Sequence, residues 1–503
     1  MDFSDFIDHY KTKLYSLFNE QNDIDKISLE RGLPQDIFED IMECKPLSVF
    51  IPEEYGGRGA ETHEALSMLE ASSYESLPLS LMMGINGALF LQPVANYGSK
   101  EVKKPVFDRF LKENNMGGLM ITEPDFGSDA LHMETSFKKI KKDGGSVYDI
   151  KGTKHWAGLT GAADFWLITA RQRNGGDKLG RDIGFFIHDS RRGGIEVEEY
   201  YKNVGLYMLP YGRNNINISV PEEYRLEPSS TGIKMMLDVL HRSRLQFPGM
   251  GIGFLKRMME EGITHCKERY VGGQSLFNYD QVKKRLHRLQ SSFTIVSAMC
   301  AYTSENVPLS KNVAGMDLSA NAIKSYCTDL MQQASQSLLQ LMGAKGYRLD
   351  NIAGRAFIDS RPFQIFEGSN DILYQQISES VLKQMRRLKF KNLYNFLSDF
   401  RLTKRASEYF SEILDFKINQ SLGQNRLVEL GRILSRVISL EFTLRLGDKG
   451  FNQALINNAI KTMRADVERM VTTFINEKSP EVVENYEESS SWLDSITPQY
   501  VHT

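Results

Sequence analysis

The stretch DFWLITAR, from Asp164 to Arg171, decides how this chain divides, because its aromatic and β-branched residues predict a strand. Two similar runs follow, DIGFFIHD (Asp182 to Asp189) and NNINISV (Asn214 to Val220). Long patterns with helical periodicity lie on both sides, up to about Gly118 and again from about Gly232. The sequence therefore predicts a mostly α protein with an inserted β domain.

The predicted organisation has four segments. They are an N-terminal helical domain over residues 1–118, a β domain over 119–226, a helical bundle over 227–388 and an additional helical segment over 389–503. In the last segment an apolar stripe occupies one face of a helix with a period of 3.6 residues: Leu430, Ile433, Leu434, Val437 and Leu444. Such a stripe is more often core than a partner or membrane surface, so we interpret it as core.

Composition excludes several classes of function. The formal net charge of -3 favours neither nucleic acid nor an anionic membrane as a partner. The four cysteines show neither a CxxC pair nor a histidine at ligand spacing, which argues against a disulfide framework and a zinc site. The N-terminal stretch is typical of an amphipathic helix and not of a targeting signal, and no run reaches the ~20 apolar residues of a membrane span. We expect a soluble, cytoplasmic protein without a transmembrane segment.

Glycine-rich and catalytic signatures are mostly missing. GMGIGF, from Gly249 to Phe254, has the spacing GxGxG inside a helical pattern, so it predicts close helix packing and not a nucleotide loop. The chain contains no Walker, HExxH or GxSxG motif. The usual phosphoryl-transfer, zinc-protease and serine-hydrolase chemistries are therefore disfavoured.

Three other stretches allow two interpretations each. MITEPDFGSD, from Met120 to Asp129, is either a loop that hydrogen-bonds a flat heteroaromatic edge or a phosphate, or a plain turn. Trp156 either covers one face of a planar cofactor or is a buried tryptophan of the sheet. Arg269 either meets a pyrophosphate or is a surface arginine before a turn.

In combination these stretches become specific. IPEEYGGRG, NYGSKEVKK, ITEPDFGSD, GTKHW, RSRLQFPGMGIGF, CKERYVGG, QLMGAKGY and QIFEGSNDIL follow one another over about residues 1–384. In this order and spacing the chain resembles the acyl-CoA dehydrogenase family. The resemblance implies an α-helical domain, a β-barrel-like middle domain and a four-helix bundle. It also implies that FAD lies between the last two domains and an adjoining subunit, and that the protein is an oxidoreductase of fatty-acid and lipid metabolism.

The resemblance also implies a set of site residues. Glu367 matches the catalytic base, and the substrate would meet Ser128, Arg244 and Gly368. The residues implied in cofactor binding are Thr122, Gly127, Ser128, Trp156, Thr160, Arg269, Gln281, Gln340, Gly343, Ser369 and Asp371. Because Arg269 and Gln340 match positions that reach the FAD of a neighbouring subunit, a homodimer at least is implied.

The surroundings of Glu367 in QIFEGSNDIL suit a base. Removing the α-proton of a thioester needs a carboxylate without a competing partner, in a dry site that raises its pKa. Ile365 and Phe366 supply apolar neighbours, and Gly368 lets backbone N–H groups approach the substrate carbonyl, where they would stabilise an enolate. The other interpretation is that Glu367 is a helix N-cap or a loop acid.

The chain also departs from the family pattern. After Trp156 the usual Ile-Thr-Asn is replaced by Ala157, Gly158 and Leu159, so the threonine expected near the flavin is missing, and Thr160 is the nearest hydroxyl. Gln281 is shifted by one residue. The FAD pocket is therefore expected to be kept but altered in detail.

Several alternatives stay open at this point. An acyl-CoA oxidase would share the base and FAD but pass electrons to oxygen, and a non-catalytic flavoprotein or binding module would have lost the chemistry. The resemblance implies electron-transfer flavoprotein as acceptor, and the thioester is carried by coenzyme A or an acyl carrier protein. We expect the segment 389–503 to cover the surface through which shorter relatives pair dimers into tetramers, so a dimer is predicted.

Overall fold

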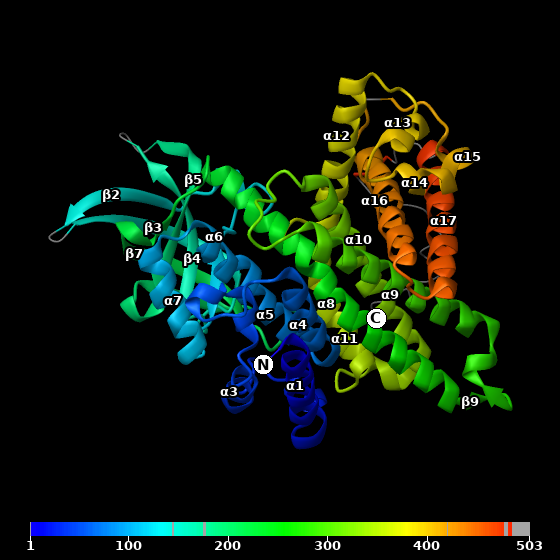
Figure 1. The fold of residues 1–503 in the computed structure, drawn as a ribbon, viewed down its shortest axis with the longest axis horizontal. Coiled ribbons are helices and arrows are strands. Elements are labelled where there is room, and N and C mark those ends of the chain that lie inside the picture. The colour runs from blue at the N-terminus through cyan, green and yellow to red at the C-terminus, as the bar shows by residue number, and fades with distance from the viewer. Residues whose placement is uncertain (1, 143–144, 175–177, 420, 477–480, 485–503) are drawn as a thin grey trace, which may run out of the picture.

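The computed structural model describes residues 2–142, 145–174, 178–419, 421–476 and 481–484. The larger β sheet lies at one end of the molecule, and the helices extend from it to the other end (Figure 1). The helices of residues 404–476 lie at the opposite end from the sheet. The predicted mostly α fold with an inserted β domain is confirmed.

The N-terminal part is helical. Its elements are α1 (Phe3–Tyr15), η1 (Ser16–Gln21), α2 (Ile24–Ile27), α3 (Gln35–Met42), η2 (Pro46–Phe50), η3 (Glu53–Tyr55), α4 (Thr62–Glu75), α5 (Leu77–Gly84), η4 (Ile85–Leu91), α6 (Gln92–Tyr97) and α7 (Lys100–Lys112). The continuous helical stretch Leu77–Tyr97 has the length and apolar composition of a membrane span, with a mean hydropathy of 1.3, contrary to the sequence-based expectation. In this fold 94% of the 18-residue apolar window within that stretch is buried, as in the core helix of a globular protein.

The middle part is the β domain. Its strands are β1 (Gly117–Met120), β2 (Ser136–Lys142), β3 (Gly145–Gly158), β4 (Phe165–Arg173), β5 (Leu179–Asp189), β6 (Ile195–Tyr200), β7 (Tyr211–Pro221) and β8 (Arg225–Leu226), in the order β6-β7-β3-β2-β4-β5-β8, with β1 beside β4. In DFWLITAR the segment Phe165–Ala170 is buried along its whole length, whereas β7 alternates buried and exposed residues. Alternation of this kind is typical of a strand with one face on the core.

The next part contains the longest helices. They are α8 (Gly232–Glu268), α9 (Asp280–Asn306), α10 (Asp317–Met342), α11 (Ile352–Ser360) and α12 (Asn370–Leu388), with a hairpin of β9 (Tyr270–Val271) and β10 (Gln274–Ser275) after α8. The helix α8 packs on α4 at the GMGIGF stretch, where a Cβ on Gly253 would lie 2.1 Å from the carbonyl oxygen of Glu70. Only glycine permits that approach, so the predicted close helix packing is confirmed.

The additional segment is helical and packs on the preceding helices. It contains α13 (Leu393–Asp399), α14 (Lys404–Ser407), η12 (Glu408–Phe410), α15 (Ser411–Leu414), α16 (Gln424–Asp448) and α17 (Gln453–Asn476). The predicted apolar stripe of α16 is buried, which confirms it as core. At Gly431 a Cβ would lie 1.9 Å from the carbonyl oxygen of Tyr374, so α16 lies directly against α12.

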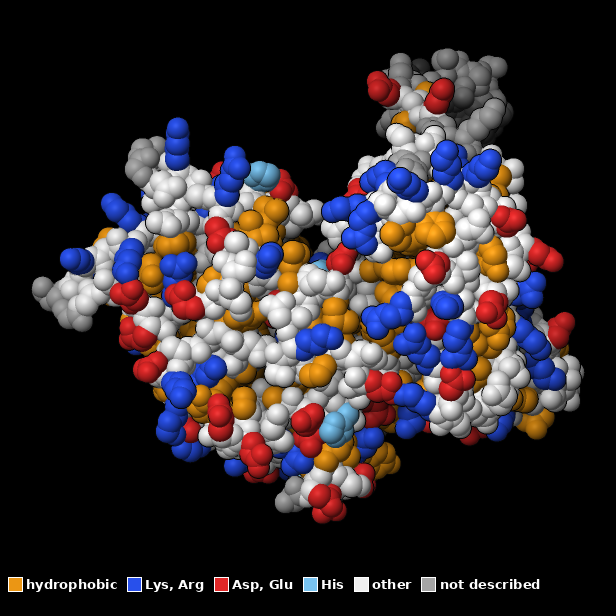
Figure 2. Space-filling view, turned by 45° about the horizontal axis from the view of Figure 1, so that its top comes forward, with side chains coloured by type: hydrophobic (Ala, Val, Ile, Leu, Met, Phe, Trp, Pro, Cys, Tyr) orange, Lys and Arg blue, Asp and Glu red, His pale blue; other side chains and the backbone are white. Residues whose placement is uncertain are grey.

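The molecular surface carries charges of both signs. Figure 2 shows Lys and Arg side chains interspersed with Asp and Glu side chains over the face in view, and a notch between the β domain and the additional helices. No single-sign field covers that face, in agreement with the small net charge.

Candidate active site

Glu367 lies in a short loop between η11 (Arg361–Gln364) and α12. Its φ is 55° and that of Gly368 is 88°, so two consecutive residues adopt the left-handed region. A non-glycine residue there costs free energy and is held by surrounding contacts. The N-cap residue of α12 is Ser369, which excludes the interpretation of Glu367 as the N-cap.

The two carboxylate oxygens of Glu367 differ in their hydrogen bonding. The hydroxyl of Ser243, on α8, donates a hydrogen bond to Oε1 over 2.8 Å. The other oxygen, Oε2, is buried and has no hydrogen-bond partner among the described residues. Burial raises the pKa of Glu367, while the Ser243 hydroxyl and the charges of Arg244 and Lys324 pull it back down. The site therefore holds a carboxylate whose proton affinity is increased and whose second oxygen is available.

Two buried cations hold the backbone carbonyls of this loop. Arg244 donates from Nε to the carbonyl oxygen of Glu367 over 3.0 Å, and from Nη1 to Oδ1 of Asn321 over 2.8 Å. Lys324, on α10, donates from Nζ to the carbonyl oxygen of Gly368 over 2.9 Å and to Oδ1 of Asn370 over 3.0 Å. Burial lowers the pKa of Lys324 to about 7. Together, α8 and α10 fix the orientation of the loop that carries Glu367.

An exposed aromatic side chain of the β domain extends from a bulge. Trp156 has a φ of 55°, and the register between β3 and β7 shifts on either side of it, which re-aims a side chain at a bulge. The side chain is 51% exposed, which excludes the buried sheet tryptophan. Its ring centroid lies 4.5 Å from that of Tyr201 and 6.3 Å from that of Tyr211.

Tyr211 lies beside this aromatic side chain, and the charge of Glu367 affects its pKa. Burial, and next the Glu367 carboxylate, raise the pKa of Tyr211, so the phenol and the carboxylate lie within electrostatic reach. The β domain therefore presents an exposed aromatic side chain, and the helical bundle holds a buried carboxylate oxygen without a hydrogen-bond partner among the described residues.

The loop MITEPDFGSD is tied to the strand that carries Trp156. Glu123 accepts a hydrogen bond from Nζ of Lys154 over 2.8 Å, and both side chains are buried. Burial alone would raise the pKa of Glu123, but attraction and hydrogen bonding to Lys154 lower it below its ordinary value. The Thr122 carbonyl also accepts from the backbone N–H of His155 over 3.0 Å. This anchoring leaves Gly127 and Ser128 exposed at the tip of the loop.

The structure does not bring every predicted residue to this site. The Thr160 hydroxyl is buried, where it donates to the Ala157 carbonyl over 2.8 Å and accepts from Asn214 over 3.1 Å. Arg269, Gln281, Gln340 and Gly343 are exposed, at or near the ends of α8, α9 and α10. The Asp371 carboxylate accepts a hydrogen bond from Arg432 of α16 over 3.0 Å.

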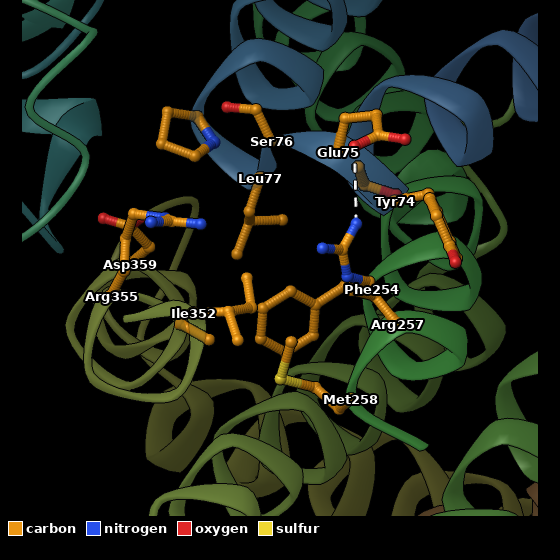
Figure 3. A pocket seen from close by; sticks show the side chains of 13 residues that line it. Tyr74, Glu75, Ser76, Leu77, Phe254, Arg257, Met258, Ile352, Arg355 and Asp359 are labelled. Carbon is orange, nitrogen blue, oxygen red and sulfur yellow. Dashed lines mark hydrogen bonds and ion pairs between the residues drawn. The ribbon is translucent and has the colours of Figure 1, made fainter. Parts of the chain in front are cut away.

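A small cavity elsewhere does not serve as the site. It lies between α4, α5, α8 and α11, beside the ion pair of Arg257 and Glu75 (Figure 3). The volume is about 20 Å³. A cavity of that size holds about one water molecule and no acyl group.

Sequence reasoning missed Ser243, Lys324, Tyr211 and the pair of Glu123 and Lys154. The sequence offers one usable signal, a lone lysine within the small and apolar run SANAIKSYC around Lys324. A buried lysine needs a partner, so such a residue indicates a polar site inside the core.

Models of three consecutive domains match the chain. They are the acyl-CoA dehydrogenase N-terminal domain at residues 19–114, the middle domain at 118–217 and the C-terminal domain at 230–382. Among curated proteins, the very long-chain specific acyl-CoA dehydrogenase of Mus musculus is 23% identical over 71% of this chain and 54% of its own length. The acyl-CoA dehydrogenase of Bacillus subtilis is 24% identical over 67% of this chain and 86% of its own length. The chain thus spans about half the length of the very long-chain relative.

Two solved structures show the same fold. An acyl-CoA dehydrogenase complexed with FAD from Bacillus anthracis matches with a TM-score of 0.75 at 17% identity, over 95% of this chain and 89% of that one. Butyryl-CoA dehydrogenase from Megasphaera elsdenii matches with a TM-score of 0.66 at 17% identity, over 76% of this chain and 100% of that one. The first match therefore extends into the additional helical segment, and the second leaves unmatched a part similar in length to residues 389–503. With three domain models in order over most of its length, the chain belongs to the acyl-CoA dehydrogenase family, whose enzymes are FAD-dependent oxidoreductases.

Proposed function

We propose that this protein catalyses the FAD-dependent α,β-dehydrogenation of an acyl thioester, with Glu367 as the base. The observation that carries the proposal is the buried Oε2 of Glu367, which has no hydrogen-bond partner in the described part of the chain, on a loop held by two cations. A carboxylate in that state is rare in a structural role, because buried polar groups are normally satisfied. It is the state that a general base needs before substrate binds.

The residues present fit the cofactor of the family. The exposed face of Trp156 suits stacking on a planar ring, and the exposed loop at Gly127 and Ser128 can approach its edge. Ser369 is the N-cap residue of α12, two positions after the base. When bound, FAD supplies the two-electron acceptor for the β-hydrogen, which leaves as hydride.

The chain itself provides the proton chemistry. Glu367 Oε2 would take the α-proton. The α-carbon is a weak acid, and the raised pKa of the carboxyl makes Glu367 a stronger base toward it at neutral pH. Because the N–H of a trans peptide points opposite to its carbonyl, the N–H of Gly368 points away from Arg244. We propose that this N–H donates a hydrogen bond to the thioester carbonyl oxygen, where it would stabilise the charge of the enolate.

An anaerobic titration tests the function. Purified protein with FAD is mixed with saturated acyl-CoA thioesters of several chain lengths, and the yellow flavin absorbance is followed. We expect at least one thioester to bleach the flavin and to yield a trans-2-enoyl product. A flavin that no thioester bleaches would favour the binding module, and rapid reoxidation by air would identify an oxidase.

Removing the Ser243 hydroxyl is expected to move the pH dependence. The hydroxyl stabilises the charged form of Glu367, so Ser243→Ala raises the pKa of Glu367, and the acidic limb of kcat shifts to higher pH. A hydrogen bond of about 0.5–1.5 kcal/mol corresponds to a shift of about half a unit to one unit. Ser243→Thr keeps the hydroxyl and should retain the wild-type profile. An unmoved limb in Ser243→Ala would show that this bond does not act on the base.

The positions of the distant residues support a homodimer. The helix α8 is continuous from Gly232 to Glu268, and at 1.5 Å per residue Arg269 lies about 37 Å along it from Arg244. Arg269 therefore fits the site of a second copy better than its own. Tyr270 beside it is 67% exposed and Tyr347 is 83% exposed, as expected for apolar groups that meet a partner.

Solution mass tests this assembly. We expect about twice the chain mass of 57.3 kDa by light scattering, because α16 and α17 occupy a face of the helical bundle. A clear tetramer would contradict the predicted role of the additional segment. Electron-transfer flavoprotein as acceptor, the choice between coenzyme A and an acyl carrier protein, and the cytoplasmic location stay predictions.

A further inference from the structure

The carboxylate of Asp329, on α10, joins the two ends of the loop that carries Glu367. Its Oδ1 accepts a hydrogen bond from the Gln364 side chain over 2.6 Å and another from the Asn370 side chain over 2.7 Å. Gln364 precedes Glu367 by three residues, and Asn370 follows it by three. The other oxygen, Oδ2, accepts from the hydroxyl of Tyr374, one turn into α12, over 2.6 Å. One side chain therefore holds both ends of the loop and the helix that follows it.

The loop between these ends depends on outside contacts. Glu367 and Gly368 both have a positive φ, and such a conformation persists only where its surroundings hold it. Hydrogen bonds to a carboxylate are charge-assisted and roughly twice as strong as neutral ones. Asn370 is 6% exposed, so water has little access to its bond to Asp329. Because Lys324 holds the Gly368 carbonyl, the two charged side chains of α10 fix different parts of the same loop.

A buried arginine of the additional segment lies within electrostatic reach of Asp329. Arg436 is on α16, which packs on both α10 and α12, and it is 4% exposed. Its guanidinium lies 4.3 Å from the ring centroid of Tyr326, and Nη1 donates to the carbonyl oxygen of Arg432 over 2.8 Å. Burial alone would lower the pKa of Arg436, but the tyrosines and carboxylates around it, Asp329 among them, raise it above its ordinary value.

Two cations thus compensate the charge of Asp329. Lys324 comes from the same helix, and Arg436 comes from the additional segment. Charges that are taken out of water destabilise a fold unless opposite charges compensate them. Without Arg436, the Asp329 carboxylate would be compensated by Lys324 alone, and a movement of the loop that lets water reach the carboxylate would become favourable.

We propose that Asp329 is a positioning residue for the base and that Arg436 stabilises it in this role, so that the additional helical segment supports the loop that carries Glu367. The inference rests on the proposed function only in taking Glu367 as the base. It gives α16 a role in catalysis besides covering the helical bundle.

Two variants of Asp329 in the flavin-loaded full chain test the role of the carboxylate. Asp329→Leu has a similar volume but cannot accept, so Gln364 and Asn370 lose their shared partner. We expect kcat to fall by about 10²-fold, the cost of misplacing a catalytic group by about 1 Å, with a much smaller change in KM. Hydrogen–deuterium exchange of residues 361–372 should become faster. Asp329→Asn keeps an acceptor oxygen in a side chain of the same shape and should retain most of the turnover.

Arg436→Gln tests the contribution of the additional segment. We expect faster exchange of the same loop and a kcat lowered by about tenfold, or about 1.4 kcal/mol, within the range of coupling between residues of one network. The matched control is Arg426→Gln. Arg426 also lies on α16, but its guanidinium lies 4.5 Å from the ring centroid of Phe474 and donates to the Phe474 carbonyl over 2.8 Å, both on α17. Equal behaviour of the two arginine variants would overturn the role of the additional segment.

The other outcomes are also distinct. Wild-type loop exchange and wild-type kcat in Asp329→Leu would overturn the proposal. Faster exchange spread evenly over α10, α12 and α16 would overturn it as well, because that result indicates general loosening. If the wild type turns over no thioester, the proposed function fails, whereas faster exchange confined to the loop still supports the positioning by Asp329. Should Asp329→Leu fail to fold, Gln364→Leu removes one donor, leaves the carboxylate in place and allows the same measurements.

Discussion

Glu367→Gln is expected to bind FAD as the wild type does and to turn over an acyl thioester at least about 10²–10⁴-fold more slowly. The amide has nearly the same shape, so the bond from Ser243 and the two carbonyl bonds from Arg244 and Lys324 can persist. The variant lacks the carboxylate oxygen Oε2, the group in this loop that would take the proton. Steady-state kcat with an artificial electron acceptor, and the bound flavin absorbance, provide the two measurements.

Glu261→Gln is the matched control for this variant. Glu261 also lies on an element next to the bundle core, where it pairs with Arg257 over 2.9 Å, but it is remote from the Glu367 loop along α8. It should retain wild-type turnover. If Glu367→Gln turned over at the wild-type rate, another group would have to be the base.

Lys324→Met is expected to lower kcat by about 10²-fold while the chain stays folded and retains FAD. Methionine fills a similar volume but cannot donate, so the carbonyl of Gly368 and Oδ1 of Asn370 lose their shared partner. The loop is then free to turn, and misplacement of a catalytic group by about 1 Å costs about 10²-fold. Turnover and thermal melting of the same preparation separate this effect from general unfolding.

A control and a pH profile sharpen that experiment. Thr328→Val removes the hydroxyl that accepts from Asn370 over 3.0 Å, one turn further along α10, but leaves the bond to Gly368. Thr328→Val should keep most of the turnover.

The Lys324 charge lowers the pKa of Glu367, so in Lys324→Met the acidic limb of kcat should move to higher pH. Wild-type turnover in Lys324→Met would show that the bond to Gly368 does not position the base.

The architecture followed from local patterns. The run of aromatic and β-branched residues at Phe165 predicts a strand because its side chains must be buried, and β4 is buried there. The stripe of α16 predicted a core face for the same reason, since burial of apolar surface dominates folding. Sequence patterning did not identify the π-helical turns Ser16–Gln21 and Ile85–Leu91, because no periodicity marks them.

The candidate site was only partly predictable. Glu367 lies in a loop and Trp156 at a strand bulge, and the residues of both stretches are unusual in themselves, whereas the partners of Glu367 come from other helices. Ser243 is 124 positions away along the chain, so no local pattern connects it to the carboxylate. Arg432 belongs to the additional segment, and only the packing of α16 on α12 brings it to Asp371. Such contacts depend on tertiary structure that a single sequence does not display.

Proton exchange tests the central claim most directly. A saturated acyl thioester is incubated anaerobically in D2O with flavin-loaded protein, and deuterium at the carbon next to the carbonyl is measured by mass spectrometry. The account predicts that the wild type introduces deuterium there and that Glu367→Gln does not. Equal deuterium incorporation by the two proteins would contradict the assignment of Glu367 as the base.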